Sequence, residues 1–205
     1  MNQEALSEKG KKILSELRNF SNFYLAGGTA LALQIGHRKS ADFDLFSEKK
    51  ISGGLLSKIK NVFHQNSFAL SVNNPDELTV FIDGIKITFL KYPFRVISKL
   101  VEYEGVNLLS IKEIAATKAY TVGRRCSYKD YIDLYFIISE HLSDLNEIIK
   151  LAEKKYGGEF NSRLFLEQLV YVEDIKDTEI IFLKQAVGKK DVESFFQKKI
   201  GEIKL

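Results

Sequence analysis

The 205-residue sequence predicts an α/β fold, with a mixed α+β sheet domain over residues 1–100 and a mostly helical domain over residues 101–205. Two observations support this division. Up to Leu109, short apolar segments of strand length alternate with turn signals and with a few short helical segments. After Leu109, apolar residues recur mainly at helical spacing. The change in character falls within residues 92–110.

The elements of the first half follow from local patterns. In chain order, we expect helices over 4–18, 30–35 and 52–65, and strands over 23–26, 42–46, 68–72, 78–82, 85–90, 96–103 and 106–109. Thr29 is expected to cap the short helix that Gly36 closes. Residues 42–46 (DFDLF) alternate acidic and apolar side chains, as a half-buried strand does. Asp83-Gly84 is a hairpin turn signal.

The second half is expected to be helical. Ser110 and Glu113 have the spacing of a capping box and predict a helix from there to about Val122. A second helix is expected over residues 128–140. Further helices are expected over 143–156, 161–170 and 178–198.

The composition is that of an ordinary globular protein, with 45% hydrophobic and 28% charged residues. Fifteen Phe and nine Tyr exclude a disordered chain, and two prolines exclude a proline-rich one. No apolar run is long enough to span a bilayer, and the first residues lack a secretory signal, so we expect a cytoplasmic protein without a membrane partner. A single cysteine, Cys126, excludes a disulfide framework and a multi-cysteine metal site.

The charge is unevenly distributed. The net charge is +3, but residues 1–100 carry 14 Lys+Arg against 9 Asp+Glu, whereas residues 101–205 carry 16 against 18. A weak basic excess in the first half fits a locally held triphosphate better than a long nucleic-acid track. The same excess also occurs in proteins with no anionic ligand.

Two glycines and two aspartates carry the chemistry of the first half. Gly27 and Gly28 allow close backbone approach to a phosphate, and the helix that follows offers unpaired N–H donors. Asp42 and Asp44 stand at i and i+2 of a strand, so both carboxylates are expected on one face, where they suit Mg²⁺. Taken separately, the glycine pair is typical of a turn and the aspartate pair is typical of a solvated strand face. Together they are the minimum equipment for metal-assisted nucleotidyl transfer.

These segments resemble a known family. Residues 25–33 (LAGGTALAL), 37–40 (HRKS) and 42–46 (DFDLF) resemble the signature of the AbiEii-type nucleotidyltransferase toxins, in the DNA polymerase β-like superfamily. Residues 113–118 (EIAATK) and 129–134 (KDYIDL), with Arg125 between them, are also similar to that family. The resemblance covers roughly residues 20–140.

The resemblance implies a Mg²⁺-dependent enzyme that moves NMP from an NTP to an acceptor hydroxyl, such as a tRNA 3′ end or a protein hydroxyl, with an antitoxin partner. The helical domain would contribute to the active-site cleft. Its implied nucleotide-binding residues are Gly27, Gly28, Thr29, Arg38, Lys118 and Asp130, its metal ligands Asp42 and Asp44, and its catalytic residues Asp42, Asp44, Lys118 and Asp133. Arg38 or Lys118 would balance charge on the phosphates.

Lys118 is conspicuous because it lies within an apolar helical stripe. Without a partner there it would bear a large desolvation cost. The following helix is apolar on nearly every side except at Asp133, with Asp130 one turn earlier. We expect Lys118, Asp133 and Asp130 to form a charged cluster that faces the nucleotide site. The alternatives are a salt bridge that only joins two helices, or a lysine whose stem snorkels to the surface.

One departure from the superfamily concerns a third carboxylate, commonly found on a later strand. The expected strand, residues 85–90, offers Lys86, Thr88 and Leu90 on the relevant face and no acid. Asp83 lies just outside it. A second hypothesis is therefore a catalytically silent nucleotide-binding module that acts through a protein partner, and a third is a fold relic without nucleotide affinity.

The remaining polar residues carry weaker signals. His37 suits phosphate or base contact as well as a capping or surface position. The basic residues Arg124, Arg125 and Lys129 suit a triphosphate or RNA, or a solvated surface.

Overall fold

The computed structural model describes residues 1–122, 124–125, 127–173, 175–176 and 178–203, so Cys126 lies outside the described residues. It divides the chain into two compact units, Met1–Leu109 and Ser110–Leu205. The first unit holds every strand of a seven-stranded sheet, and the second unit contains helices α4 to α8. This confirms the predicted mixed α/β fold followed by helices. Among the described residues, no helix combines the length and the apolar character needed to cross a bilayer.

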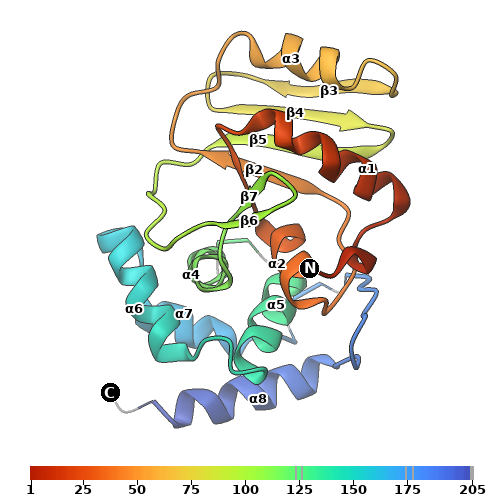
Figure 1. Cartoon of the computed structure of the whole chain (residues 1–205). Helices are drawn as coiled ribbons and strands as arrows, with labels where there is room; N and C mark the ends of the chain where they lie inside the picture. Colours follow the sequence, from red (N-terminus) through yellow and green to blue (C-terminus); the bar gives the residue numbers. More distant parts are fainter. Residues whose placement is uncertain (123, 126, 174, 177, 204–205) are drawn as a thin grey trace. The chain divides into compact units, whose positions relative to one another are not determined.

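The sheet of the first unit has the strand order β3-β4-β5-β2-β1-β7-β6 (Figure 1). Its strands are β1 Tyr24–Ala26, β2 Phe43–Ser47, β3 Phe68–Asn73, β4 Glu77–Ile82, β5 Ile85–Lys91, β6 Val101–Tyr103 and β7 Val106–Leu108. β2 lies at the centre, antiparallel to β1 and parallel to β5. β1 also pairs in parallel with β7, which brings residues 101–108 into this sheet. The predicted Asp83-Gly84 hairpin joins β4 to β5, and both residues have positive φ angles.

The helices of the first unit are α1 Glu8–Leu17, α2 Gly27–Ile35 and α3 Leu55–Val62. Phe20, which follows α1, contacts the rings of Phe63, after α3, and Phe89 of β5. Since Phe89 and Thr88 are successive residues of β5, their side chains lie on opposite faces of the sheet. α1 and α3 therefore cover the face opposite to that of Thr88.

The start of α2 differs from the sequence prediction. The helix begins at Gly27 rather than after Thr29, and no side chain caps it. Thr29 is buried in the first turn, where its hydroxyl donates to the carbonyl of Asp42. A long-range hydrogen bond has replaced the local cap. Gly36 closes the helix as predicted, with φ +62°.

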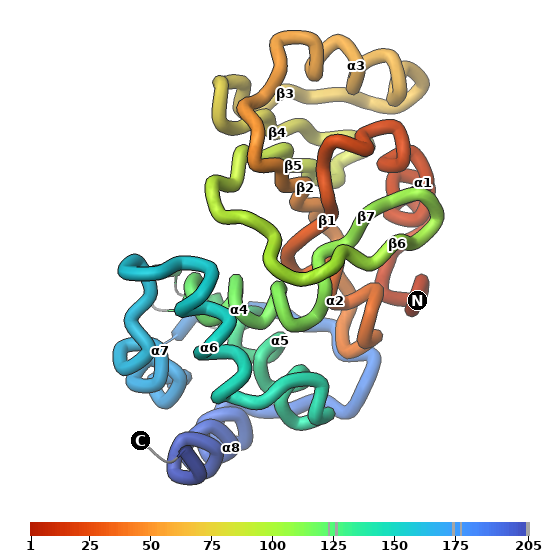
Figure 2. Tube along the Cα trace, turned by 60° about the vertical axis from the view of Figure 1, so that its left-hand side comes forward, coloured from red at the N-terminus to blue at the C-terminus, as the bar shows by residue number. Residues whose placement is uncertain are grey.

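The second unit consists of helices packed on one another (Figure 2). Their bounds are α4 Ile111–Thr121, α5 Tyr128–Ser139, α6 Leu145–Tyr156, α7 Ser162–Leu169 and α8 Lys189–Gly201. Tyr120 of α4 stacks on Tyr156 of α6 with ring centroids 4.0 Å apart. Tyr135 of α5 packs edge-on against Phe195 of α8.

The helix predicted from Ser110 to about Val122 forms as α4, but two details of the helix predictions in this unit were wrong. The capping box at the start of α4 does not form, because the Glu113 carboxylate is buried and accepts from Lys155 Nζ at 2.5 Å. The helix predicted over residues 178–198 begins only at Lys189, where the Gly188 N–H donates to the Asp191 carboxylate.

Candidate active site

The Asp44 carboxylate lies against the first residue of α2. Gly27 has φ +68°, and a Cβ built on it would stand 2.7 Å from Asp44 Oδ2. Only glycine fits this position, because any other residue would be strained at this positive φ and its Cβ would collide with the carboxylate. Ala26 pairs with Asp44 across β1 and β2, which fixes this juxtaposition through the sheet register.

Thr29 holds the chain on the approach to β2. Its Oγ1 lies 2.8 Å from Ser40 Oγ and donates to the Asp42 carbonyl. The threonine hydroxyl, predicted to bind triphosphate, is thus engaged by the segment that leads into the aspartate pair. Thr29 therefore has a structural role: its hydrogen bonds connect the first turn of α2 to the residues just before β2.

The two aspartates occupy different positions relative to β2. Asp44 is the second residue of the strand and is half-buried, whereas Asp42 precedes the strand and is exposed. Strand alternation extended by one residue places both on the same face. Among the residues that the structure describes, no group of three or more His, Cys, Asp or Glu side chains is arranged to hold a metal ion. Two adjacent carboxylates match Mg²⁺, which completes its octahedral shell with water and substrate phosphates.

Thr88 stands where a third carboxylate would be expected. It is the Cα partner of Asp44 in the parallel β2–β5 pair, and its side chain is largely buried. Asp83 does not take its place. The Asp83 carboxylate accepts from Asn66 Nδ2 at 2.6 Å and from the Ser67 N–H at 2.9 Å, at the hairpin. These two contacts lower the pKa of Asp83, the Asn66 contact most.

The loop between α2 and β2 buries two of the basic residues singled out from the sequence. His37 is fully buried, and Arg38 is 3% exposed and donates from Nη1 to the Lys39 carbonyl at 3.1 Å. The surface position considered for His37 is therefore wrong. The Arg38 guanidinium is therefore hydrogen-bonded inside the protein.

In the second unit, Lys118, Asp130 and Asp133 come together as the sequence predicted. Lys118 Nζ lies 2.6 Å from Asp130 Oδ1 and 2.6 Å from Asp133 Oδ2. The Lys118 side chain is 4% exposed and both aspartate side chains are fully buried. One lysine between two acids is the arrangement expected when a charge is buried with compensation, so the snorkelling alternative is wrong.

Arg125 completes this cluster, which we call the Lys118 cluster (Lys118, Arg125, Asp130, Asp133). It donates from Nε and Nη2 to the two oxygens of Asp130 at 2.8 and 2.9 Å. Burial by itself would raise the pKa of Asp130, but the charges of Lys118 and Arg125 outweigh it and lower the pKa. The sequence placed Arg125 in the family-like block and in a basic group, but did not pair it with Asp130. Its spacing of five residues from Asp130 is the signal that could have assigned the pair.

Sequence reasoning missed the buried Lys155–Glu113 pair between α6 and α4. Both side chains are fully buried, and the charged atoms lie 2.5 Å apart. Glu113 belongs to the sequence block that resembles the family, but its role here is to pair two helices. An acid next to Ile114 and Ala115 was the available signal, and the capping-box interpretation hid it.

Comparison with known proteins decides the family. A sequence model described as "Nucleotidyl transferase AbiEii toxin, Type IV TA system" matches residues 12–202. This chain belongs to the AbiEii nucleotidyltransferase toxin family. It is also 33% identical over 184 residues to the uncharacterized protein aq_aa25 of Aquifex aeolicus, covering 89% of this chain and 88% of the relative.

Solved structures agree on the fold of this AbiEii-family protein. The nucleotidyltransferase toxin MenT4 (Rv2826c) of Mycobacterium tuberculosis H37Rv matches with a TM-score of 0.63 and 16% identity, over 94% of this chain and 83% of that one. JHP933 of Helicobacter pylori matches with a TM-score of 0.53 and 16% identity, over 96% and 97%. The family match identifies a nucleotidyltransferase enzyme, and the solved structures show the same fold.

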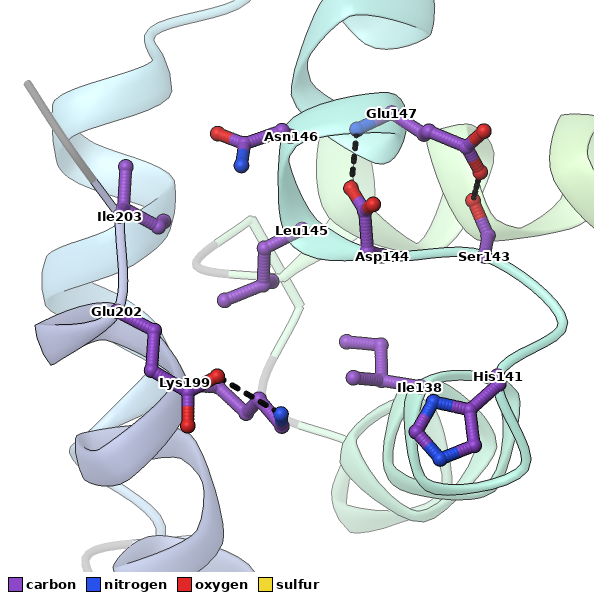
Figure 3. A pocket seen from close by; sticks show the side chains of 10 residues that line it. All are labelled: Ile138, His141, Ser143, Asp144, Leu145, Asn146, Glu147, Lys199, Glu202 and Ile203. Atoms are coloured by element: carbon purple, nitrogen blue, oxygen red, sulfur yellow. Dashed lines mark hydrogen bonds and ion pairs between the residues drawn. The ribbon is translucent and has the colours of Figure 1, made fainter.

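A hollow of about 390 Å³ in the second unit of this AbiEii-family protein is lined by none of the predicted site residues (Figure 3). Its lining residues are Ile138, His141, Ser143, Asp144, Leu145, Asn146, Glu147, Lys199, Glu202 and Ile203. Local contacts engage several of its polar groups. The Asp144 carboxylate caps α6, Glu147 accepts from Ser143, and Lys199 pairs with Glu202. The hollow is therefore not assigned to the transfer reaction.

Proposed function

We propose that this protein transfers a nucleoside monophosphate from an NTP to an acceptor hydroxyl in a Mg²⁺-dependent reaction. The observation that carries the proposal is the Asp44 carboxylate held against Gly27 at the start of α2. A helix N-terminus is a favourable place for phosphate, and an adjacent carboxylate provides a metal ligand. In a metal-bound triphosphate, the helix N-terminus would bind the phosphates and the carboxylate would bind the metal ion.

The reaction joins the acceptor oxygen to the α-phosphorus of the NTP and breaks the bond from that phosphorus to the pyrophosphate oxygen, while the acceptor hydroxyl loses its proton. Bound Mg²⁺ would supply charge neutralisation at the phosphates. Asp42 and Asp44 would hold the ion, and Gly27 and Gly28 would allow the phosphates to approach the backbone. Thr29 keeps the aspartate pair in place through Ser40 and the Asp42 carbonyl.

Lys118 is proposed as the cation that balances charge on the phosphates, with Arg38 as the other candidate. The case for Lys118 rests on the family-like sequence around it and on its burial between Asp130 and Asp133. The two acids would hold its ammonium in one orientation, since a lysine chain otherwise has four rotatable bonds. This is a positioning role for Asp130 and Asp133.

Label transfer tests the proposal. Wild-type protein is incubated with each α-labelled NTP, Mg²⁺, and either total RNA or cell protein, and labelled acceptors are separated by size. We expect transfer by wild type and a loss of about 10²-fold or more in Asp44→Asn. Asp76→Asn is the matched control, because Asp76 is an exposed acid in the turn before β4, where it pairs with Lys91 of β5. Equal activity of Asp44→Asn and wild type would contradict the proposal.

A parallel test addresses Lys118. Lys118→Arg preserves the charge but not the point geometry of the ammonium, so we expect a folded protein with reduced transfer. Lys112→Met is its control, because Lys112 lies on the same helix and is half exposed in its pair with Glu147. If both variants keep wild-type turnover, Lys118 has only a structural role.

The acceptor and the biological partner are part of the proposal. We propose an RNA acceptor such as a tRNA 3′ end, a protein hydroxyl being the alternative that the two acceptor pools distinguish. The matched family is described as the toxin of a type IV toxin–antitoxin system, which supports an antitoxin encoded nearby. Growth arrest on expression of wild type but not of Asp42→Asn/Asp44→Asn, relieved by a neighbouring gene, is the expected result.

A silent nucleotide-binding module is the second candidate, favoured by Thr88 in place of a carboxylate beside Asp44. Calorimetry with Mg²⁺ and each NTP separates the two. Binding that depends on Asp42 and Asp44, without label transfer to any acceptor, would support the module.

A further inference from the structure

An aromatic side chain follows the aspartates along β2. Phe46 lies two residues after Asp44, so strand alternation places its ring on the same face of the sheet as the Asp44 carboxylate. Phe43 and Leu45, which point to the opposite face, are buried, whereas Asp44 and Phe46 are only partly buried. β2 therefore presents a carboxylate and an aromatic ring next to each other on one face.

Two further rings extend Phe46 into a cluster, which we call the aromatic platform (Phe46, Tyr92, Phe94). The rings of Phe46 and Tyr92 stack with centroids 4.7 Å apart and planes 22° apart, and Phe94 packs edge-on against Tyr92 at 5.4 Å. The Tyr92 N–H donates to the Ser47 carbonyl at 2.7 Å, which holds the segment after β5 beside the end of β2. All three aromatic residues are partly exposed. Partly exposed rings that neighbouring rings hold in place suit stacking with a nucleobase.

The segment that carries Tyr92 and Phe94 is basic. Residues 91–99 (KYPFRVISK) contain three cations and no acid. Lys91 pairs with Asp76, while Arg95 and Lys99 are exposed. Aromatic rings interleaved with cations match a single-stranded nucleic acid, because its bases stack on the rings and its phosphates pair with the cations.

Strand pairing places the platform on one particular side of Asp44. On β1, Ala26 lies opposite Asp44. Tyr24, two residues earlier, lies opposite Phe46. Because α2 follows Ala26, it begins on the side of Asp44 that is away from Phe46. The pyrophosphate part of the NTP is proposed to bind at this start of α2. Since the attacking and leaving oxygens of phosphoryl transfer are roughly in line, the acceptor approaches from the opposite side, where the platform lies.

We propose that the aromatic platform binds the terminal base of a single-stranded RNA acceptor and thereby presents its terminal hydroxyl to the α-phosphorus. This inference rests on the proposed function and assigns residues to the acceptor. Phe46 and Tyr92 would stack with the base, and Lys99 would pair with a backbone phosphate. The base of the NTP is the other source of a nucleobase, and the experiment separates the two.

Binding of two matched RNAs tests the platform. Both are the same short single-stranded oligoribonucleotide with a fluorophore at its 5′ end, but one lacks the base of its 3′ nucleotide. Stacking on an aromatic side chain contributes about 5- to 100-fold to affinity, so we expect Phe46→Leu to raise Kd for the intact RNA by about tenfold. Its Kd for the abasic RNA should equal that of wild type, because no terminal base is present to stack. Phe46→Tyr keeps a ring and should bind both RNAs as wild type does.

Phe81→Leu is the matched control, because Phe81 is a 37% exposed aromatic residue on β4 of the same sheet. It should leave both affinities unchanged. Lys99→Gln should weaken both RNAs alike and reduce the slope of log Kd against log salt concentration by about 0.7. In the transfer assay, Phe46→Leu should raise KM for the RNA and leave both KM for the NTP and kcat at saturating RNA unchanged. Thermal unfolding confirms that each variant is folded; if Phe46→Leu is not, Tyr92→Leu replaces it with the same expectations.

Several outcomes would overturn the platform. One is an affinity of Phe46→Leu for the intact RNA equal to that of wild type, and another is an equal loss on both RNAs. A raised KM for the NTP with unchanged RNA affinity would assign the rings to the NTP base instead. Labelling of protein alone by wild type would also overturn the platform, while NMP transfer itself would stand. Absence of label transfer by wild type to either acceptor pool overturns the proposed function and, with it, this inference.

Discussion

Replacing Gly27 with alanine tests the central geometry of the site. The residue has φ +68°, where a Cβ costs about 1–2 kcal/mol. That Cβ would also stand 2.7 Å from Asp44 Oδ2, so the carboxylate or the start of α2 has to shift. We expect Gly27→Ala to lose about 1–2 kcal/mol of stability from the backbone alone, and label transfer to fall by about 10²-fold because a metal ligand is displaced.

Gly84→Ala is the matched control for this experiment. Gly84 has φ +82° in the β4–β5 hairpin, and no atom lies within 4 Å of a Cβ built there. It therefore carries the same backbone strain without the collision. Unfolding of both variants in urea measures the free-energy loss, and the transfer assay measures activity. If Gly27→Ala and Gly84→Ala lose equal stability and both keep wild-type transfer, the contact between Gly27 and Asp44 has no part in catalysis.

Three further predictions concern the charged groups. Lys155→Met leaves Glu113 buried without its cation and should lower the free energy of unfolding by about 3–5 kcal/mol. The double variant Lys155→Met/Glu113→Leu should recover much of this loss. A double variant as unstable as the single one would contradict this reasoning. The pKa of Asp130 is lowered by folding, so its stabilisation is present above its usual value of 3.8 and is lost as the pH falls further. Urea midpoints from pH 6 to pH 2 should thus decline less steeply in Asp130→Asn than in wild type, and parallel declines would refute the assignment. Asp83→Ala should leave label transfer unchanged, because its carboxylate is engaged at the hairpin; a large loss would return Asp83 to the site.

Local patterns predicted the elements whose causes are local. The β4–β5 hairpin forms at Asp83-Gly84 because both residues adopt positive φ angles in the turn itself. Gly36 ends α2 for the same kind of reason. The pairing of Lys118 with Asp130 and Asp133 could be predicted because an apolar helix tolerates a charge only with a compensating partner.

Predictions failed where a distant group competed for a local donor or acceptor. Thr29 was expected to cap its own helix, but its hydroxyl donates a hydrogen bond to the carbonyl of Asp42, 13 residues along the chain. Glu113 was expected to complete a capping box, but Lys155 pairs with its carboxylate from another helix. Once helix packing buries the Glu113 carboxylate, leaving it without its cation would cost more than losing a cap at a helix end, so the tertiary contact prevails.

The sequence by itself predicted the family, the α/β fold with helices after it, and a set of candidate site residues. The two glycines, the aspartate pair and the lysine within an apolar stripe can be recognised from residue type and local spacing alone. Only the tertiary structure decided which residues stand together, such as Asp44 against Gly27 and Thr88 beside Asp44. The physical reason is that sheet register joins strands far apart in the chain, and no local pattern specifies which residue of one strand lies opposite which residue of the next.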